Sequence, residues 1–461
     1  MQRMLGKTNR IHFIGIGGIG MSGMAELLHN LGFEITGSDR SISERTRYLE
    51  SMGISILEGH DPESLPDCDV VVYSSAVRKD NPEIAAAENL GIPVIRRAEM
   101  LGELLKVKPV SIGVAGTHGK TTTSSMLGAI LTAANRQPTL VIGGIVNSLE
   151  SNAISGTGDI IVVEADEFDR TFLSLHATMA IITNVELEHL DCYENLQDLQ
   201  NAFIQFANAV PFYGRIAVCI DHPNVQMIIP KIKRPLVTYG FSNQADLRAK
   251  NIQCKERITL FEVMHLNEAL GEVELQVPGE FNVLNALAAI SLALELDVPF
   301  PVIVNGLAQY SGVRRRFEIR HHLENDILLV DDYAHHPSEV LVTLQAARGG
   351  WDRRIVVVFQ PHLYSRTRDF HRDFAQAFMY SDVLVGTDIF AAREEPVAGI
   401  NGEIILTDAR EFGHKNVVWV PDKDDLPERV AELIQPGDLV LTMGAGDIWR
   451  YNDKIAEAIQ A

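Results

Sequence analysis

One loop between a predicted strand and a predicted helix constrains the fold more than any other feature of this sequence. The apolar run 110–115 precedes it, the predicted helix 123–133 follows it, and the loop reads Gly116-Thr117-His118-Gly119-Lys120-Thr121-Thr122. Glycines at such a turn let backbone N–H groups approach a phosphate chain, and the helix N-terminus adds partial positive charge. The loop therefore predicts an α/β domain that binds a nucleoside triphosphate, with Lys120 on the phosphates and Thr121 on Mg²⁺.

The loop departs from the usual P-loop spacing at one position. Val114 stands five residues before Gly119, where that spacing has a glycine. An ordinary strand-to-helix turn is the alternative interpretation. The apolar run before the loop and the helical segment after it favour phosphate binding.

A second glycine-rich turn lies near the N-terminus. Gly15, Gly17 and Gly20 match G-x-G-x-x-G between the predicted strand 11–14 and the predicted helix 21–31. Asp39 ends the next predicted strand, where a carboxylate accepts ribose hydroxyls. Because the helix N-terminus binds only the diphosphate, a dinucleotide and a nucleoside diphosphate sugar both fit. A tight turn selected for packing is the alternative.

Short apolar runs bounded by turns alternate with helical stretches along all 461 residues. Such runs are typical of parallel strands buried on both faces. We expect an α/β chain with three domains: a Rossmann-like domain over 1–107, a P-loop ATPase-like domain with a mostly parallel sheet over 108–312, and a second Rossmann-like domain over 313–461. Residues 252–277 alternate more strictly, which predicts an antiparallel insertion.

The bulk properties exclude several classes of protein. With 40 basic and 61 acidic residues the net charge is −21, which argues against a general nucleic-acid or membrane partner. The four cysteines form no C-x-x-C pair, so we expect a protein of the reducing cytosol. The apolar run 11–25 contains five glycines, which fits a strand, turn and helix better than a signal peptide. No apolar run is long enough to span a membrane.

Two groups in the central block are candidate metal ligands. Glu164 directly follows the predicted strand 160–163, where acids beside a P-loop usually hold Mg²⁺. A helix N-terminus enriched in acids is the alternative. His189 lies just beyond the predicted strand 179–183, and we expect it to bind the metal or a phosphate rather than to be an ordinary surface or core histidine.

The last block carries polar groups at its start and at two predicted strand ends. Arg314, Arg315 and Arg316 open it, either as a solvated charge run or as arginines that meet a γ-phosphate. The segments 331–337 and 359–369 follow two predicted strands, where doubly wound sheets bind ligands. They hold histidines, a tyrosine and arginines, and arginine binds a carboxylate in bidentate fashion.

These motifs together resemble the Mur ligases of peptidoglycan synthesis. The stretch 14–23 resembles the N-terminal signature of that family, and 116–122 resembles its ATP loop. The segments 164–167, 332–337 and 359–362 resemble further signatures. The resemblance covers the whole chain, with the motifs in the family's order.

The resemblance implies an ATP-dependent ligase that joins L-alanine to UDP-N-acetylmuramic acid through an acyl phosphate. It implies that the first domain binds the UDP part, that the middle domain binds ATP and Mg²⁺, and that the last domain receives the amino acid and closes over the site. His335 is our candidate for the base that takes the amine proton.

The resemblance also assigns residues. For the UDP-sugar these are Gly15, Gly17, Gly18, Gly20 and Asp39. For ATP they are the loop 116–122 and Asn285, and for Mg²⁺ they are Thr121, Glu164 and His189. For the amino acid they are Tyr333, His335 and Arg366, and one of Arg315 and Arg316 is assigned to the γ-phosphate.

Three other functions remain open at this point. A recycling ligase would join the same nucleotide sugar to a murein tripeptide. A nicotinamide-dependent oxidoreductase would use the turn 15–20 but leave the loop 116–122 unexplained. A non-catalytic nucleotide-binding regulator would not need Lys120, Glu164 and His189. Both a monomer and a homodimer are compatible with the sequence.

Overall fold

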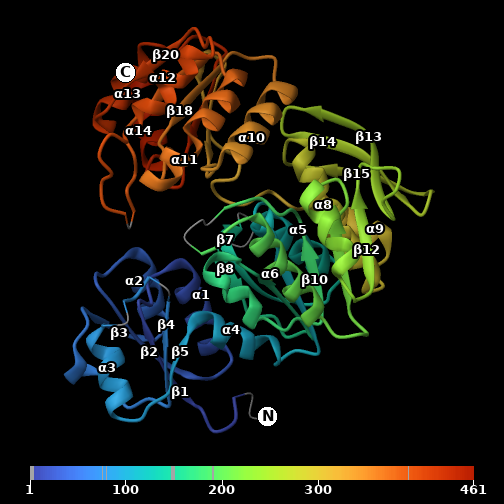
Figure 1. The fold of residues 1–461 in the computed structure, drawn as a ribbon, viewed down its shortest axis with the longest axis vertical. Coiled ribbons are helices and arrows are strands. Elements are labelled where there is room, and N and C mark those ends of the chain that lie inside the picture. The colour runs from blue at the N-terminus through green and yellow to red at the C-terminus, as the bar shows by residue number, and fades with distance from the viewer. Residues whose placement is uncertain (1–4, 75, 79, 147–150, 189–191, 393) are drawn as a thin grey trace. The chain divides into compact units, whose positions relative to one another are not determined.

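The computed structural model describes residues 5–74, 76–78, 80–146, 151–188, 192–392 and 394–461 (Figure 1). The chain forms two compact units, which we call unit 1 and unit 2. Unit 1 comprises Met1–Lys250, Glu262–Val273 and Leu284–Tyr310, and unit 2 comprises Asn251–Phe261, Glu274–Val283 and Ser311–Ala461. The architecture confirms the predicted α/β class with three mostly parallel sheets.

The first sheet of unit 1 has five strands in the order β3-β2-β1-β4-β5, all parallel. Its strands are β1 (Arg10–Ile14), β2 (Glu34–Asp39), β3 (Ser55–Glu58), β4 (Val70–Tyr73) and β5 (Val94–Arg96). Its helices are α1 (Ile19–Asn30), α2 (Glu44–Ser51), α3 (Pro82–Asn89) and α4 (Arg97–Leu105). Strand β1 pairs with both β2 and β4, which brings the carboxyl ends of all three to one edge.

The second sheet has ten strands in the order β15-β14-β13-β12-β11-β10-β6-β9-β7-β8. The strands are β6 (Val110–Ala115), β7 (Thr139–Val146), β8 (Ser151–Ile154), β9 (Ile160–Glu164), β10 (Met179–Ile182), β11 (Arg215–Cys219), β12 (Leu236–Gly240), β13 (Leu247–Lys255), β14 (Ile258–His265) and β15 (Glu268–Leu275). The helices are α5 (Lys120–Ala133), α6 (Leu196–Ala209), α7 (Pro223–Ile228), α8 (Glu280–Glu295) and α9 (Phe300–Ala308). Strand β6 lies between β10 and β9 and pairs in parallel with both.

The antiparallel insertion predicted over 252–277 is present as β13–β15. Only two residues separate β13 from β14 and β14 from β15, and such short connections join neighbouring strands only when they run antiparallel. Leu266 and Asn267 in the second connection have φ of 48° and 72°, as a type I′ hairpin turn requires. The antiparallel pairing of β8 with β7 was not predicted from the sequence.

The sheet of unit 2 has the order β16-β17-β21-β18-β19-β20, with β16 antiparallel to β17 and the other pairs parallel. The strands are β16 (Glu318–Leu323), β17 (Ile327–Asp332), β18 (Ile355–Phe359), β19 (Val383–Gly386), β20 (Val417–Trp419) and β21 (Leu439–Met443). The helices are α10 (Pro337–Gly350), α11 (Tyr364–Ala377), α12 (Glu403–Glu411), α13 (Leu426–Ala431) and α14 (Trp449–Gln460).

Strand β18 shows why the apolar runs of this block predicted buried parallel strands. Val357 and Phe359 pack into the core formed with α10, α11 and α12, whereas Val356 and Val358 pack into the core formed with α13 and α14. Because both faces of the strand are covered, the strand reads as a continuous apolar run.

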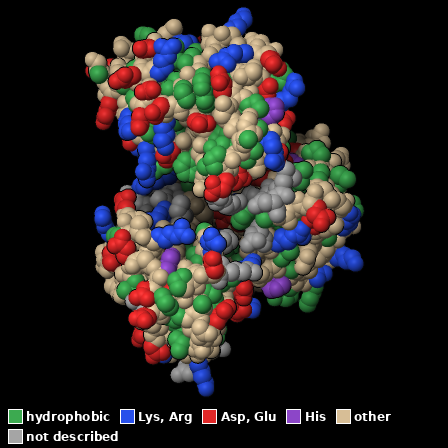
Figure 2. Space-filling view, turned by 60° about the vertical axis from the view of Figure 1, so that its left-hand side comes forward, with side chains coloured by type: hydrophobic (Ala, Val, Ile, Leu, Met, Phe, Trp, Pro, Cys, Tyr) green, Lys and Arg blue, Asp and Glu red, His purple; other side chains and the backbone are tan. Residues whose placement is uncertain are grey.

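Short 3₁₀ helices complete the described elements: Pro62–Ser64, Phe168–Ser174, Ile229–Lys231, Glu324–Asp326, Phe378–Tyr380 and Lys423–Asp425. Figure 2 shows acidic and basic side chains interspersed over the visible face, so the net negative charge is not gathered there into one patch. Among the described residues, no helix combines the length and the apolar character that a membrane crossing requires.

Candidate functional site

The phosphate loop predicted at 116–122 connects β6 to α5, which begins at Lys120. Gly116 and Gly119 have φ of 135° and 82°, a region that favours glycine. A Cβ at Gly116 would lie 1.9 Å from Thr183 Oγ1, and one at Gly119 would lie 2.4 Å from Asn285 Oδ1. Val114 belongs to β6 and is fully buried, so the missing glycine falls in the strand and not in the loop.

Lys120 is held at the centre of this loop. Its Nζ donates to the carbonyl oxygens of Gly116 at 2.7 Å and Thr117 at 3.1 Å, and to Glu167 Oε2 at 2.7 Å. Burial acts to lower the pKa of Lys120, but the carboxylates of Glu167 and Asp166 outweigh it and raise that pKa above its ordinary value. Lys120 therefore carries a positive charge where a triphosphate would lie.

Glu167 is a partner that the sequence analysis did not assign. Its side chain is buried, and its Oε1 has no hydrogen-bond partner among the described residues. Burial raises the pKa of Glu167, and the neighbouring ammonium of Lys120 acts against that rise. The acidic run 164–167 was the only signal for it in the sequence.

Two of the three predicted metal ligands lie together. Thr121 Oγ1 is 3.0 Å from each carboxylate oxygen of Glu164, and the backbone N–H of Gly143 donates to Glu164 Oε2 at 2.7 Å. A hydroxyl and a carboxylate beside a phosphate loop are hard oxygen donors that fit Mg²⁺. His189, the third predicted ligand, lies outside the described residues.

The segment after β10 is joined to the phosphate loop by several hydrogen bonds. Glu186 N donates to Thr117 Oγ1 at 2.9 Å, and His118 N donates to Asn184 Oδ1 at 2.8 Å. The carboxylate of Glu186 lies 3.3 Å from His118 Nε2 and 3.5 Å from His222 Nε2. Glu186 and His222 were missed because only the parallel pairing of β6, β10 and β11 brings their strand ends to one edge.

Asn285 lies on α8 and contacts the start of α5. Thr123 Oγ1 donates to Asn285 Oδ1 at 3.2 Å, and the side chain is buried against Gly119. Its predicted role at the adenine stays a prediction. Thr122, the last residue of the loop, is buried in the first turn of α5.

The first glycine-rich turn has the geometry of a diphosphate loop. Gly15 has φ of 77°, and Gly17 N donates to Asp39 Oδ2 at 2.8 Å. Gly18 caps α1 without a side chain, which leaves the helix N-terminus open to an anion. A Cβ at Gly20 would lie 2.0 Å from Arg97 Nη1, so this guanidinium lies against the turn. Arg97 was missed because it starts α4, far along the chain.

Unit 2 gathers the predicted amino-acid residues at the carboxyl ends of β17 and β18. The rings of Tyr333 and His335 lie 5.1 Å apart, and those of His335 and His362 lie 6.0 Å apart. Arg366 Nη1 is 3.3 Å from His362 Nδ1. His335 Nδ1 is 3.0 Å from the carbonyl oxygen of Tyr333 and 3.0 Å from Glu339 Oε2.

The two arginines at the start of unit 2 differ in their partners. Arg315 Nε is 3.0 Å from Asp331 Oδ2, and its Nη2 donates to the carbonyl of Gly444 at 2.5 Å. Arg316 Nη1 is 3.3 Å from Glu339 Oε1. Both guanidinium groups lie over the ring of Tyr333, at 4.8 Å and 5.2 Å.

Asp332 links the segments on either side of β17 through hydrogen bonds to their backbone. It accepts hydrogen bonds from Phe317 N at 2.7 Å and Ala334 N at 2.8 Å. Burial raises the pKa of Asp332 to about 6, although the charge of Arg316 acts in the opposite direction.

Family models and similar proteins along the whole chain point to the same family. Three family models match the chain: "Mur ligase family, catalytic domain" over residues 10–109, "Mur ligase middle domain" over 114–293, and "Mur ligase, glutamate ligase domain" over 315–446. The UDP-N-acetylmuramate–L-alanine ligase of Salinibacter ruber is 50% identical over 461 residues, which are 100% of this chain and 97% of that protein. The protein of the same name from Geobacter sp. (strain M21) is 48% identical over 459 residues, which are 99% of each chain.

Solved structures give the same result. The crystal structure of a UDP-N-acetylmuramate–alanine ligase from Thermotoga maritima has a TM-score of 0.82 and 32% identity, and the match covers 98% of this chain and 99% of that one. A murein peptide ligase from Psychrobacter arcticus has a TM-score of 0.71 and 26% identity, with 98% of each chain covered. The resemblance inferred from the motifs is thereby confirmed: this chain belongs to the Mur ligase family.

Proposed function

We propose that this chain is an ATP-dependent ligase that joins L-alanine to the lactyl carboxylate of UDP-N-acetylmuramic acid, giving ADP and phosphate, in the synthesis of peptidoglycan precursors. The names of full-length relatives at 48–50% identity support this substrate pair. The observation that carries the proposal is the presence of two phosphate-binding turns in one chain, at 15–20 and 116–122. One fits a nucleoside diphosphate and the other a triphosphate.

The first step activates the carboxylate, which is a poor electrophile at neutral pH. A carboxylate oxygen attacks the γ-phosphorus, the bond from phosphorus to the ADP oxygen breaks, and an acyl phosphate forms. Lys120 and the N-terminus of α5 stabilise the negative charge that develops on the phosphoryl oxygens. Thr121 and Glu164 would hold Mg²⁺, which when bound neutralises phosphate charge.

The second step forms the amide. The amine of alanine attacks the acyl carbon, the tetrahedral intermediate collapses, phosphate leaves, and the amine proton goes to a base. His335 suits this role: Nδ1 faces the Tyr333 carbonyl and Glu339, which favours the proton on Nδ1 and a lone pair on Nε2. Arg366 provides the cation for the alanine carboxylate.

Of the two candidates for the γ-phosphate arginine, we favour Arg316. The guanidinium of Arg315 already donates to Asp331 and Gly444, and both bonds support the local fold. The side chain of Arg316 is more exposed than that of Arg315, at 32% against 20%, which suits a group that meets a bound phosphate.

The test is phosphate release with ATP and UDP-N-acetylmuramic acid across single amino acids and the murein tripeptide. We expect L-alanine to be the best amine substrate. Preference for the tripeptide would replace the proposal with the recycling ligase; the similar Psychrobacter protein is named a murein peptide ligase. A nicotinamide-dependent oxidation would contradict both.

The proposal places the reaction in the cytoplasm, in keeping with the four cysteines, all of which have free thiols. ATP and the two other substrates complete the set of partners. Either a monomer or a homodimer is compatible with this function.

A further inference from the structure

The connection that follows β19 contacts the start of α11, the helix that carries Arg366. We call residues 388–392 and 394 the β19 loop. Leu363 N donates to the carbonyl of Phe390 at 3.0 Å, and Phe390 N donates to the carbonyl of Pro361 at 2.8 Å. The ring of Phe390 stacks on His362, with centroids 5.8 Å apart and an interplanar angle of 12°. The β19 loop therefore holds both the backbone and the ring of the segment before α11.

Glu394 caps α11 from outside the helix. Leu363 at the N-cap position provides no side-chain hydrogen bond, and its φ is 71°, a left-handed conformation that non-glycine residues rarely adopt. Glu394 Oε2 accepts from Ser365 N at 2.9 Å, and Glu394 Oε1 accepts from Ser365 Oγ. A carboxylate at this position satisfies an N–H group that the helix cannot satisfy itself and complements the helix dipole.

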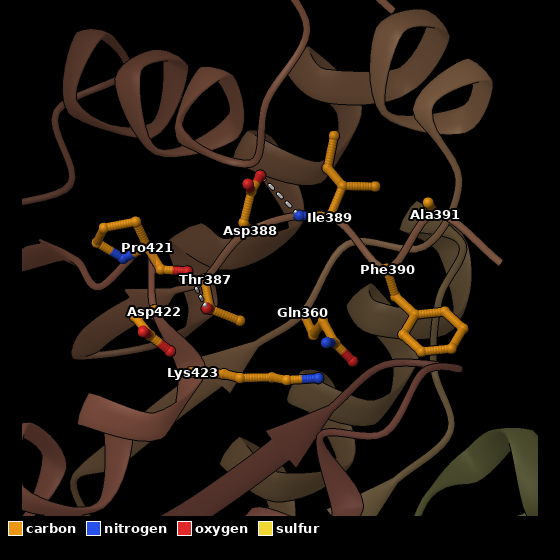
Figure 3. A pocket seen from close by; sticks show the side chains of 9 residues that line it. All are labelled: Gln360, Thr387, Asp388, Ile389, Phe390, Ala391, Pro421, Asp422 and Lys423. Carbon is orange, nitrogen blue, oxygen red and sulfur yellow. Dashed lines mark hydrogen bonds between the residues drawn. The ribbon is translucent and has the colours of Figure 1, made fainter. Parts of the chain in front are cut away.

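The opposite side of the β19 loop faces a cavity. Ile389, Phe390 and Ala391 line a space of about 510 Å³, together with residues that follow β18 and β20 (Figure 3). The loop has two other contacts: Phe390 lies against Gly446, and Gly402 N donates to Asp388 Oδ1 at 3.3 Å. Its hydrogen bonds with the start of α11 add to these contacts and hold the first turn of that helix in return.

We propose that Glu394, supported by Phe390, is a positioning residue for amino-acid binding. Arg366 follows Ser365 directly in the first turn of α11. The hydrogen bond from Ser365 N to Glu394 therefore fixes the backbone from which the Arg366 side chain extends. Phe390 sets the ring plane of His362, which lies 3.3 Å from Arg366. This inference rests on the proposed function and deepens it, because it links the affinity for the amino acid to a loop outside the motifs.

The first experiment separates the Michaelis constants of Glu394→Ala. We expect the KM for alanine to rise about tenfold because the Arg366 guanidinium loses its fixed position, while the KM values for ATP and UDP-N-acetylmuramic acid change less than about twofold. Glu394→Gln keeps an oxygen acceptor for Ser365 N and should restore most of the affinity. Glu395→Ala, at the exposed neighbouring acid, is the matched control and should behave as the parent protein.

A purely structural role would give a different result. Equal rises in all three KM values, or an unchanged KM for alanine, would overturn the proposal. So would a Glu394→Gln variant as impaired as Glu394→Ala.

The second experiment does not depend on which amine is the substrate. Amide hydrogen exchange in peptides spanning 364–368 should accelerate at least fivefold in Glu394→Ala and not in Glu395→Ala. Unchanged exchange there refutes the cap. If the full-length protein releases phosphate with no single amino acid, the proposed function fails, and the exchange result still decides whether Glu394 holds α11.

Discussion

The phosphate loop of unit 1 and the amino-acid residues of unit 2 are built in different ways. In unit 1, Gly116 to Thr121 are consecutive, and the path of their backbone follows mainly from two glycines, one strand end and one helix start. Glu167 and the segment 184–186 add hydrogen bonds to this loop. In unit 2, the candidate groups come from three segments, at 315–316, 333–335 and 362–366. Asp331, Asp332, Glu339 and Glu394 hold these segments in place.

A sequence motif describes a site made of consecutive residues better than a site assembled from distant segments. A contiguous loop carries its own geometry, so residue types and spacing predict most of it. A site assembled from distant segments depends on acids that no motif identifies. Substitutions should therefore have sharp, local effects in the loop and effects transmitted through neighbours in unit 2.

The largest effect is expected at Lys120. Lys120→Ala should lower kcat about 10²- to 10³-fold, because the γ-phosphate loses the cation that stabilises its charge during transfer. Binding of UDP-N-acetylmuramic acid, measured by calorimetry, should stay within about twofold. Lys106→Ala, at an exposed lysine paired with Glu103, is the control. Retained ADP formation would remove Lys120 from the mechanism.

Arg366 tests the assembled site. Arg366→Ala should raise the KM for alanine about 30- to 100-fold and the KM for ATP much less, because a charge-assisted bond to the alanine carboxylate is lost. Steady-state kinetics with each substrate varied in turn measures this ratio. Arg368→Ala, on the same helix but paired with Asp369, should change neither constant. Equal rises for alanine and ATP would contradict the assignment.

Arg97 tests whether the first glycine-rich turn relies on a distant cation. Arg97→Ala should raise the KM for UDP-N-acetylmuramic acid about tenfold and leave that for ATP unchanged, because the guanidinium lies beside Gly20, in the turn proposed to bind the diphosphate. Arg78→Ala, at an exposed arginine paired with Asp80, serves as the control. An unaffected nucleotide-sugar KM would show that the helix N-terminus suffices.

The smallest effect concerns the pH dependence of stability through Asp332. Its pKa is about 6 in the folded protein and near 3.8 in an unfolded chain, so between these values the folded state binds the proton more tightly. The stability from this group therefore falls as the pH rises from about 4 to 6 and is constant above.

Thermal unfolding of the parent protein and Asp332→Asn measures this effect. The difference in midpoint, parent minus variant, should decrease by a few °C between pH 4.5 and 6 and stay level from 6.5 to 8. The variant keeps one acceptor oxygen for Phe317 N or Ala334 N, so it should fold. A difference that is independent of pH would show that Asp332 titrates normally.

Local features of the fold and the site could be predicted from the sequence, whereas contacts between distant segments could not. Sequence reasoning predicted β6, the phosphate loop and the acid at the end of β9, because local glycine content and apolar runs determine those features. It missed Arg97 beside Gly20, Glu186 beside His118 and Glu394 beside Ser365. The partners in these pairs lie 29 to 77 residues apart or in loops without a recognisable pattern, so nothing local links them.

The sequence alone determined the α/β class, the two glycine-rich turns and the family, because backbone freedom at glycine and the burial of apolar runs act over a few residues. The tertiary structure alone decided which groups meet at each strand edge. The strand orders β10-β6-β9 and β17-β21-β18 place Glu186 at the phosphate loop and the Gly444 carbonyl at Arg315. Strand order depends on packing across the whole sheet, and no local interaction specifies it.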